Sequence, residues 1–270
     1  NMLMHAMPSR CFDVGIAEGH AVTFSAGMAA AGMVPFCNIY SSFMQRAYDN
    51  VIHDVAIQDL PVVMCLDRGG IVGEDGVTHH GVFDMAAFGA VPGLTIAAPM
   101  DELELRNMMY TGLQYGHPFM IRYPRGNSEL DDCSDTPEKM ELGRGRKMRE
   151  GTRLAVLSLG TVLPDVIEAA RDIDGVAVYD MIFAKPLDEN ILAEVAALGC
   201  PILTVEDGAA SGGMGSAVSD WFAARGHNVR VEHLGMPDDF VTHGTPAQLK
   251  EICGYDAAGI RSAINNLLES

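Results

Sequence analysis

Short apolar segments of strand-like composition alternate with helical segments along most of the chain, and this alternation constrains the fold more than any other feature. Several of these segments are almost continuously apolar, which is typical of parallel strands covered by helices on both faces. The first half therefore predicts one α/β domain, with strands at Cys11–Asp13, Val34–Asn38, Val62–Asp67, Leu94–Ala97 and Phe119–Arg122. Its predicted helices are Ala17–Ala31, Ser42–Asp59, Phe83–Phe88 and Asp101–Tyr115, the last with Asp101 as N-cap and Glu104 at the capping-box position.

The periodic pattern fails between Gly126 and about Gly151, where an acidic stretch gives way to a basic cluster of Arg144, Arg146, Lys147 and Arg149. The cluster could bind phosphate, but a solvated linker is the favoured interpretation. Beyond it the alternation resumes. Strands are predicted at Arg153–Leu159, Val176–Tyr179, Ile202–Val205 and Val229–Leu234, and helices at Val162–Arg171, Glu189–Ala196, Ser216–Ala224, Pro246–Ile252 and Ala257–Leu268.

These patterns predict an α/β protein with two domains, each built on a parallel or mixed sheet. The expected boundaries are 1–127 for the first domain, 128–151 for a linker and 152–270 for the second domain. A chain of 270 residues is long enough for two such domains, each with its own core.

Charge and cysteine usage limit the partners and the compartment. The chain holds 18 Lys and Arg against 36 Asp and Glu, a formal net charge of −18, which argues against nucleic acid or an anionic membrane as a partner. No apolar run reaches the ~18 residues that span a bilayer. The six cysteines are scattered without CxxC pairs, and no signal peptide is apparent, so we expect a reducing, cytoplasmic location. The chain does not begin with Met, which suggests a piece of a longer protein.

Glu18 is the first candidate for chemistry. It lies at the head of an Ala-, Gly- and Met-rich helical segment within Cys11–Tyr48, where a charged carboxylate is unusual. Burial there should raise its pKa unless a cation lies nearby. Stabilisation of the helix N-terminus by a first-turn Glu is the alternative interpretation.

A second set of candidates follows in the helix predicted at Ser42–Asp59. Helical spacing would place Phe43, Arg46 and Asn50 on one face, with Tyr40 at the helix entry. An aromatic ring beside a guanidinium suits a planar ligand with an anionic group. A core Phe and a solvated Arg explain these residues equally well.

Two further candidate regions follow predicted strands, where ligands bind in open α/β sheets. The loop after Val62–Asp67 is rich in Gly and carries Arg68, Asp75, His79 and His80. Proton transfer or hydrogen bonding to a substrate suits the two His better than a metal site, because no third ligand lies at a suitable spacing. Arg125 follows the strand at Phe119–Arg122, so Arg68 and Arg125 could converge on a phosphate. The glycines of Gly212–Gly215 could also hold phosphate, although tight strand-to-helix packing is favoured there.

Four motifs, DVGIAEGHAV, YSSFMQRAYDNVIHDVA, DRGGIVGEDGVTHHG and YPRGN, occur in this order. Together they closely resemble the 1-deoxy-D-xylulose-5-phosphate synthase family, thiamine-diphosphate enzymes of the transketolase type. These enzymes condense pyruvate with glyceraldehyde 3-phosphate and release CO2, supplying isoprenoid, thiamine and pyridoxal biosynthesis. The resemblance runs from Cys11 through the second domain, and it implies a transketolase pyrimidine-binding domain, here without its first strand, followed by a transketolase-type C-terminal domain.

The resemblance also implies roles for individual residues. Glu18 would exchange a proton with the cofactor's aminopyrimidine ring, Phe43 would stack on that ring, and Tyr40 and Arg46 would lie near the reacting end. Arg68 and Arg125 would hold the triose phosphate, while Asp75 and His79 would contact its hydroxyl and carbonyl groups. The family implies a cytoplasmic homodimer that requires Mg²⁺.

The sequence departs from the family pattern in three ways. Gly19 and His80 stand where the family often has Gln. The GDG motif that holds the diphosphate and Mg²⁺ in the family is absent, so no metal ligands are expected in this chain, and the fragment alone should be inactive. Alternatives of the same fold are a separately encoded transketolase-like half, a 2-oxo-acid dehydrogenase β subunit, and a non-catalytic dimerisation module.

Overall fold

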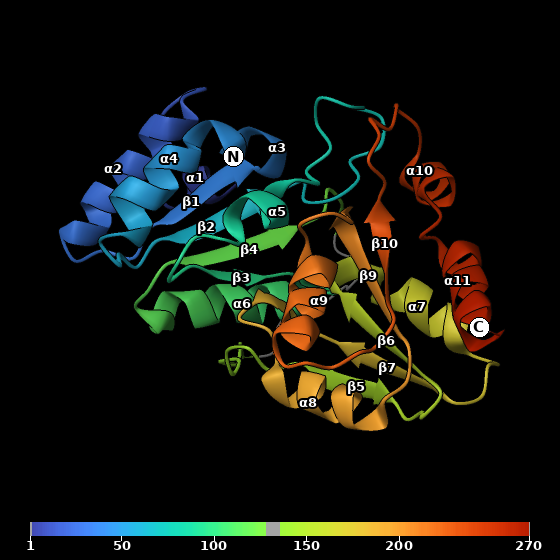
Figure 1. Ribbon diagram of the computed structural model, residues 1–270. Coiled ribbons are helices and arrows are strands. Elements are labelled where there is room, and N and C mark those ends of the chain that lie inside the picture. Colours follow the sequence, from blue (N-terminus) through green and yellow to red (C-terminus); the bar gives the residue numbers. More distant parts are fainter. Residues whose placement is uncertain (1, 128–135, 270) are drawn as a thin grey trace.

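The computed structural model describes residues 2–127 and 136–269 and contains two five-stranded sheets (Figure 1). The strands are β1 Phe36–Tyr40, β2 Val63–Asp67, β3 Thr95–Ala97, β4 Phe119–Tyr123, β5 Arg146–Arg149, β6 Leu154–Leu159, β7 Val176–Asp180, β8 Phe183–Lys185, β9 Ile202–Ala209 and β10 Val231–Met236. The α-helices are α1 Met2–Ala6, α2 Glu18–Ala30, α3 Ser41–Met44, α4 Tyr48–Asn50, α5 Asp84–Phe88, α6 Glu102–Tyr115, α7 Leu163–Ala170, α8 Glu189–Leu198, α9 Met214–Ala224, α10 Pro246–Cys253 and α11 Ala257–Glu269. Pro8–Arg10, Gln45–Ala47 and Gly160–Val162 are 3₁₀ helices, and Val51–Ala56 is a π-helix.

The first sheet has the strand order β1-β2-β4-β3-β8, and its first four strands are parallel. The inner strand β2 is buried and apolar up to Asp67, as expected for a strand covered on both faces. Helix α2 and the segment from α3 to the π-helix pack against one face, and α6 packs against the other (Figure 1). The Asp101 side chain accepts a hydrogen bond from the Glu104 amide at 2.8 Å, which confirms the predicted N-cap of α6.

The second sheet has the order β10-β9-β6-β7-β5, with β5 antiparallel at its edge. Helices α8 and α9 cover one face and α7 and α11 the other (Figure 1). The predicted α/β class with two mixed sheets is confirmed. Most predicted elements are present, with ends that differ by a few residues.

The two sheets are joined by β8, which follows β7 in the chain but pairs antiparallel with β3 of the first sheet. Buried side chains from both halves also share one continuous apolar core that extends from Val22 of α2 to Phe222 of α9. The halves therefore pack as one body.

Three local predictions are wrong. Cys11–Asp13 forms no strand, because three extended residues find no neighbouring strand to pair with. The helix predicted at Ser42–Asp59 is broken into α3, a 3₁₀ turn, α4 and a π-helical turn, with non-helical torsions at Ala47. Arg146–Arg149, assigned to the linker, is strand β5, while residues 128–135 of that linker lie outside the described residues.

Within the described part of the chain, no helix combines the length and the apolar character needed to cross a membrane. The cysteines there, Cys11, Cys37, Cys65, Cys200 and Cys253, are all free thiols.

Candidate active site

Glu18 is the first residue of α2, and its carboxylate forms an ion pair with Arg46. Glu18 Oε1 lies 2.8 Å from Arg46 Nη1, and only 13% of the Glu18 side chain is exposed. No side chain caps this end of α2, so the carboxylate is also the group that complements the helix dipole in the first turn. The structure thus places Glu18 at the head of the helix, mostly buried, with a cation beside it.

Aromatic side chains lie next to this ion pair. The Arg46 guanidinium lies 4.8 Å from the centre of the Phe43 ring. Tyr40, at the end of β1, stacks nearly parallel to Phe43 with a centroid distance of 5.7 Å. The ring of His79 meets Phe43 edge-on at 5.2 Å. Although the predicted helix is broken, its Phe43 and Arg46 still form one surface with Glu18, Tyr40 and His79.

Asn50 lies behind this surface and turns toward α2. Its amide nitrogen is 3.0 Å from Thr23 Oγ1 and 3.3 Å from Asp54 Oδ2. The Asn50 side chain also lies over Gly19, where an added Cβ would stand 2.9 Å from Asn50 Oδ1. Any side chain at position 19 would therefore require Asn50 to move.

Arg68 follows β2 directly and has a left-handed backbone conformation, with φ of 63°. This conformation is costly for a non-glycine residue and is found more often at functional sites than elsewhere. The guanidinium lies 3.8 Å from the centre of the Tyr40 ring and pairs with Asp67. Among the described residues, nothing accepts a hydrogen bond from its Nε.

Arg125 follows β4, the neighbour of β2 in the sheet. Because Asp67 and Tyr123 are paired at the ends of these strands, Arg68 and Arg125 leave the sheet at the same edge. Arg125 Nη1 lies 3.3 Å from Asp75 Oδ2, and both side chains are about two-fifths exposed. Each arginine thus has its own carboxylate in this structure, and their convergence on one phosphate stays a prediction.

The two adjacent histidines point to different surroundings. His79 is half-buried against Phe43, and its Nδ1 lies 2.9 Å from Thr78 Oγ1. His80 is buried, and its ring contacts the backbone at Val72 and Thr242. Among the described residues, no group of three His, Cys, Asp or Glu side chains is arranged to hold a metal ion.

A buried polar network beneath the loop was missed by sequence reasoning. Arg122 in β4 forms an ion pair with Asp84 at 2.8 Å, and it donates hydrogen bonds to the carbonyls of Gly81 and Asp207. The Ser41 hydroxyl donates to the same Asp84 carboxylate. The signal was available, because Arg122 is a charged residue inside an otherwise apolar predicted strand.

The glycines of Gly212–Gly215 do not form an open phosphate site, which agrees with the favoured interpretation of close packing. The buried Glu206 carboxylate occupies the N-terminus of α9, where it accepts hydrogen bonds from the amides of Met214 at 2.9 Å and Gly215 at 2.8 Å. Burial raises the pKa of Glu206 to about 7. The anion that this helix end would attract is therefore part of the chain itself.

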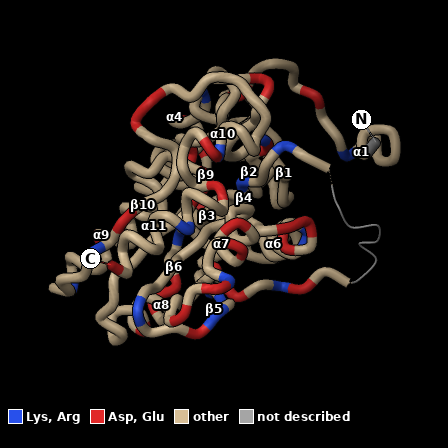
Figure 2. The backbone as a smooth tube through the Cα atoms, turned by 90° about the vertical axis from the view of Figure 1, so that its right-hand side faces the viewer, with Lys and Arg blue, Asp and Glu red and all other residues tan. Residues whose placement is uncertain are grey.

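The basic cluster at β5 is likewise occupied by internal partners. Arg146 pairs with Glu104 and Asp180, and the side chain of Arg149 donates hydrogen bonds to carbonyls near the end of α7. Lys147 pairs with Glu150 and Glu194 on the outer face. Figure 2 shows this alternation of basic and acidic stretches around β5. These contacts disfavour a phosphate site at this cluster.

Comparison with protein families defines the class to which this architecture belongs. The transketolase pyrimidine-binding domain family matches residues 2–129, and the transketolase C-terminal domain family matches residues 143–260. The chain is thus a tandem of the two domains that follow one another in thiamine enzymes of the transketolase type.

Individual relatives narrow the class. The 1-deoxy-D-xylulose-5-phosphate synthases of Bacteroides thetaiotaomicron and Bacteroides fragilis are 55% and 54% identical to this chain over 95% and 98% of its length. The matched parts cover only 40% and 42% of those relatives, so the chain spans about two fifths of the length of the curated relatives it matches. The chain belongs to the 1-deoxy-D-xylulose-5-phosphate synthase family over this portion, which confirms the resemblance seen in the sequence.

Solved structures of transketolases share this fold. A split-gene transketolase, described as an inactive β4 tetramer, superposes with a TM-score of 0.87 and 26% identity over 98% of this chain and 86% of that one. Transketolase from Leishmania mexicana superposes with a TM-score of 0.75 at 20% identity over 94% of this chain and 37% of that one, a likeness of fold alone.

Proposed function

We propose that this chain supplies the pyrimidine-binding and acceptor-binding part of a 1-deoxy-D-xylulose-5-phosphate synthase, which condenses pyruvate with glyceraldehyde 3-phosphate and releases CO2. The observation that carries the proposal is the continuous surface formed by Glu18, Arg46, Phe43 and His79. These side chains come from three separate segments, and their residue types suit an aminopyrimidine ring with a reacting carbonyl beside it.

The donor set fits the pyrimidine side of thiamine diphosphate. The Glu18 carboxylate is mostly buried, and the Phe43 ring near it is partly exposed. The cofactor's pyrimidine ring could pack on Phe43 while one of its nitrogens exchanges a proton with this carboxylate. When bound, the cofactor would supply a nucleophilic carbon for attack on the carbonyl of a 2-oxo acid. Arg46, 2.8 Å from Glu18 Oε1, would hold the carboxylate in position for this transfer.

The acceptor would bind at the edge where β2 and β4 end. Arg68 and Arg125 would hold its phosphate, since a guanidinium group can donate two parallel hydrogen bonds to phosphate oxygens. Asp75 would give up Arg125 to the phosphate and accept a hydrogen bond from a substrate hydroxyl. His79 would donate to the carbonyl, and Tyr40, which stacks on Phe43 and lies beneath Arg68, would close this side of the site.

The diphosphate and Mg²⁺ would be held by residues outside this chain. The described residues offer no group of metal ligands, and the longer relatives contain additional sequence. We therefore expect the chain alone to be inactive. Calorimetry with thiamine diphosphate and Mg²⁺ tests this, with the full-length protein as the positive control: binding should be tight only in the full-length protein. Micromolar binding and turnover by the chain alone would contradict the proposal.

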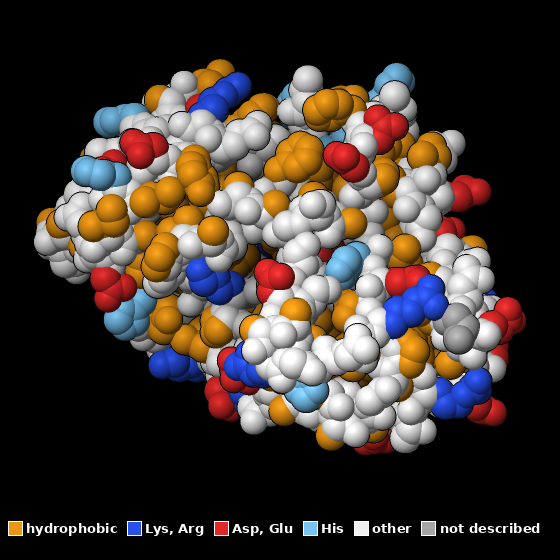
Figure 3. All heavy atoms as spheres, viewed as in Figure 1, with side chains coloured by type: hydrophobic (Ala, Val, Ile, Leu, Met, Phe, Trp, Pro, Cys, Tyr) orange, Lys and Arg blue, Asp and Glu red, His pale blue; other side chains and the backbone are white. Residues whose placement is uncertain are grey.

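We also propose that the chain forms a homodimer through its first half. Large apolar side chains are exposed on and beside α2 and α4 (Figure 3), and they include Ile16, with 94% of its surface exposed, together with Phe12, Met33, Tyr48 and Ile57. Exposed apolar surface of this kind is typical of interfaces. Light scattering coupled to size exclusion should report at least a dimer, and replacement of Ile16 and Ile57 by Asp should shift it toward the monomer. A monomer at all concentrations would contradict this proposal.

A further inference from the structure

The loop between β2 and α5 is closed at its base by a pair of backbone hydrogen bonds. Gly70 and Gly81 donate to each other's carbonyl oxygens, at 2.7 and 2.9 Å. Between them the loop carries Asp75 and His79, and most of the residues from 74 to 78 are exposed. His80, next to the closing pair, is only 5% exposed. His80 is thus buried beside the base of a loop whose tip is open, together with Ile71 and Val72 on the other side of the base.

Both ring nitrogens of His80 have backbone partners. The Val72 amide donates to Nδ1 at 3.1 Å. Because Nδ1 accepts this hydrogen bond, the ring proton is on Nε2, which lies 3.3 Å from the Thr242 carbonyl and donates to it. A single neutral tautomer therefore joins the two sides of the loop and connects them to the second half of the chain.

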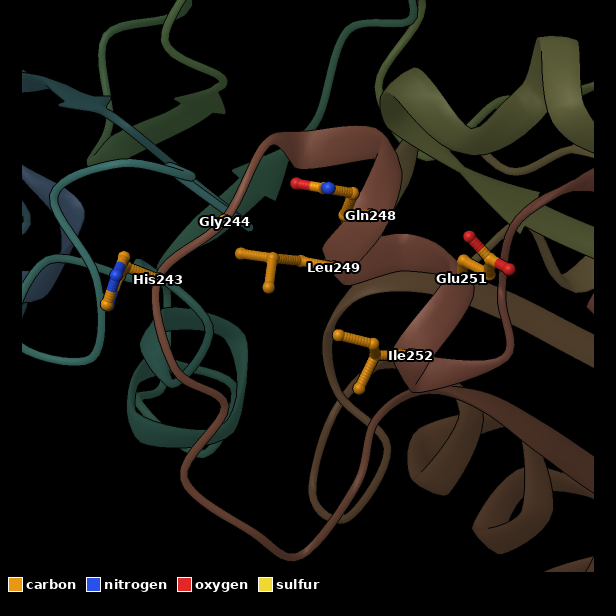
Figure 4. Close-up of a pocket in the computed structure, with 6 residues that line it drawn as sticks. All are labelled: His243, Gly244, Gln248, Leu249, Glu251 and Ile252. Atoms are coloured by element: carbon orange, nitrogen blue, oxygen red, sulfur yellow. The ribbon is translucent and has the colours of Figure 1, made fainter.

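The segment that receives this hydrogen bond is irregular, and its buried Val241 belongs to the same apolar core as Ile71 of the loop. Residues 237–245 form no helix or strand. On one side, Gly244 and Pro246 lie against Gly73. On the other, His243 and Gly244 border an open groove of about 540 Å³ toward α10, and His243 projects toward the loop of the first half (Figure 4). Residues 71–80 and this segment therefore pack directly against each other.

We propose that His80 is a positioning residue, which anchors the loop that carries Asp75 and His79 to the second half of the chain. Through the backbone of the loop it fixes the His79 ring against Phe43. The inference rests on the proposed function for what Asp75 and His79 do. A Gln side chain also carries one acceptor and one donor group and could make the same two hydrogen bonds.

The test compares two substitutions at this position with a matched control. His80→Leu keeps the bulk but leaves the Val72 amide and the Thr242 carbonyl without partners, whereas His80→Gln can restore both. The control is His117→Leu. His117 is half-exposed, pairs with Asp59 and precedes β4, at the opposite end of the strands. Amide hydrogen exchange of this chain and steady-state kinetics of the full-length protein are measured for all three variants.

In this chain, the rate of amide hydrogen exchange at Val72 should rise about tenfold in His80→Leu, because the loss of one hydrogen bond has an effect of this size. In His80→Gln the rate should return to that of the wild type. In the full-length protein, kcat/KM should fall at least tenfold in His80→Leu and recover to within about twofold in His80→Gln. His117→Leu should change neither quantity. Unchanged Val72 exchange in His80→Leu, or failure of Gln to restore it, would overturn the anchoring role.

Two further outcomes are informative. If His80→Leu does not fold, nitrogen chemical shifts of the wild-type His80 ring decide the matter, since protonation on Nδ1 instead of Nε2 would overturn the proposal. If the wild-type full-length protein lacks synthase activity, the proposed function fails, while the exchange comparison still decides whether His80 anchors the loop.

Discussion

Glu18 and Arg46 are separated by 28 positions in the sequence, yet their charged groups lie 2.8 Å apart at the head of α2. Arg46 lies in the 3₁₀ turn that follows α3, with its guanidinium over Phe43 and beside Glu18. This ion pair is compatible with two roles. The ion pair can be a structural link between helices, or it can hold a carboxylate ready for proton transfer.

Replacement of Glu18 by Gln distinguishes these roles. In the full-length enzyme we expect Glu18→Gln to lower kcat by about 10²–10⁴-fold, because Gln keeps the shape and the hydrogen bond but cannot exchange a proton. Thermal unfolding should change little. Glu189 provides a matched control, since it also begins a helix and pairs with an arginine, Arg225, at 3.2 Å. If Glu189→Gln and Glu18→Gln have the same small effect on the rate, Glu18 has no part in the chemistry.

Arg125→Ala should raise the KM for glyceraldehyde 3-phosphate far more than the KM for pyruvate. Only the acceptor carries a phosphate, and loss of a charge-assisted hydrogen bond costs about 1.5–3 kcal/mol, roughly 10–150-fold in affinity. An unphosphorylated aldehyde should be almost indifferent to the substitution. Arg171→Ala is the control, because this arginine is 65% exposed and, within the described residues, its ion pair is with Glu168. Equal losses with both aldehydes would mean that Arg125 organises the site without binding phosphate.

The buried pair of Arg122 and Asp84 should couple strongly in a double-mutant cycle. Arg122→Met leaves the Asp84 carboxylate buried without its cation, which should cost about 3–5 kcal/mol of unfolding free energy. The combination of Arg122→Met with Asp84→Leu should recover much of that loss, since no unpaired charge remains. Arg171→Met, at an exposed pair, should cost less than about 1 kcal/mol. Denaturant unfolding of wild type, Arg122→Met, Asp84→Leu, the double variant and Arg171→Met measures these free energies, and additive losses from the two single substitutions would contradict the coupling.

Glu206 should make the folded state less stable as the pH rises. Burial raises the pKa of Glu206 to about 7 in the folded chain, from an ordinary value of 4.5. The folded state therefore binds the proton more tightly than the unfolded state, and the stabilisation is complete below pH 4.5 and lost as the pH rises through 7. This difference amounts to about 3 kcal/mol.

Unfolding free energies between pH 4.5 and 8 test this effect. The difference in unfolding free energy between wild type and Glu206→Gln, plotted against pH, isolates the contribution of this carboxyl. Glu168→Gln, at an exposed position, should leave the pH dependence of the unfolding free energy unchanged. Parallel curves for wild type and Glu206→Gln would show that Glu206 titrates normally.

The class of fold and the family were predictable because their signals are local in the sequence. The apolar run of β2, the N-cap at Asp101 and the motifs around Glu18 and Arg68 depend on residues a few positions apart. The closeness of Phe43 and His79 follows from the ends of β1 and β2 meeting at one edge of the sheet, which the alternation of strands and helices already implied. Glu18 follows no strand, and its place beside Arg46 depends on the packing of α2.

The rest depends on contacts between distant segments. The charged composition of β5 reads as a solvated linker, although it is also typical of an edge strand, and its Arg146 is matched by Glu104 and Asp180 from elsewhere in the chain. Likewise, no local pattern separates His79 from His80. Their different surroundings arise from Phe43 on one side and from Thr242, 162 positions away, on the other.

The pairing of β8 with β3 bears on how this protein can be divided. β3 is fully buried, and a cut at residue 127 or anywhere before β8 would remove its antiparallel neighbour and bare a row of unpaired amides and carbonyls. A first domain produced in this way is expected to precipitate or to recruit a strand from another molecule. A soluble truncation would have to extend past Lys185 and carry β6 and β7 with it. The two domains matched by separate families therefore share one sheet and are not expected to fold independently. A protein that inherited one without the other would need a new strand to pair with β3.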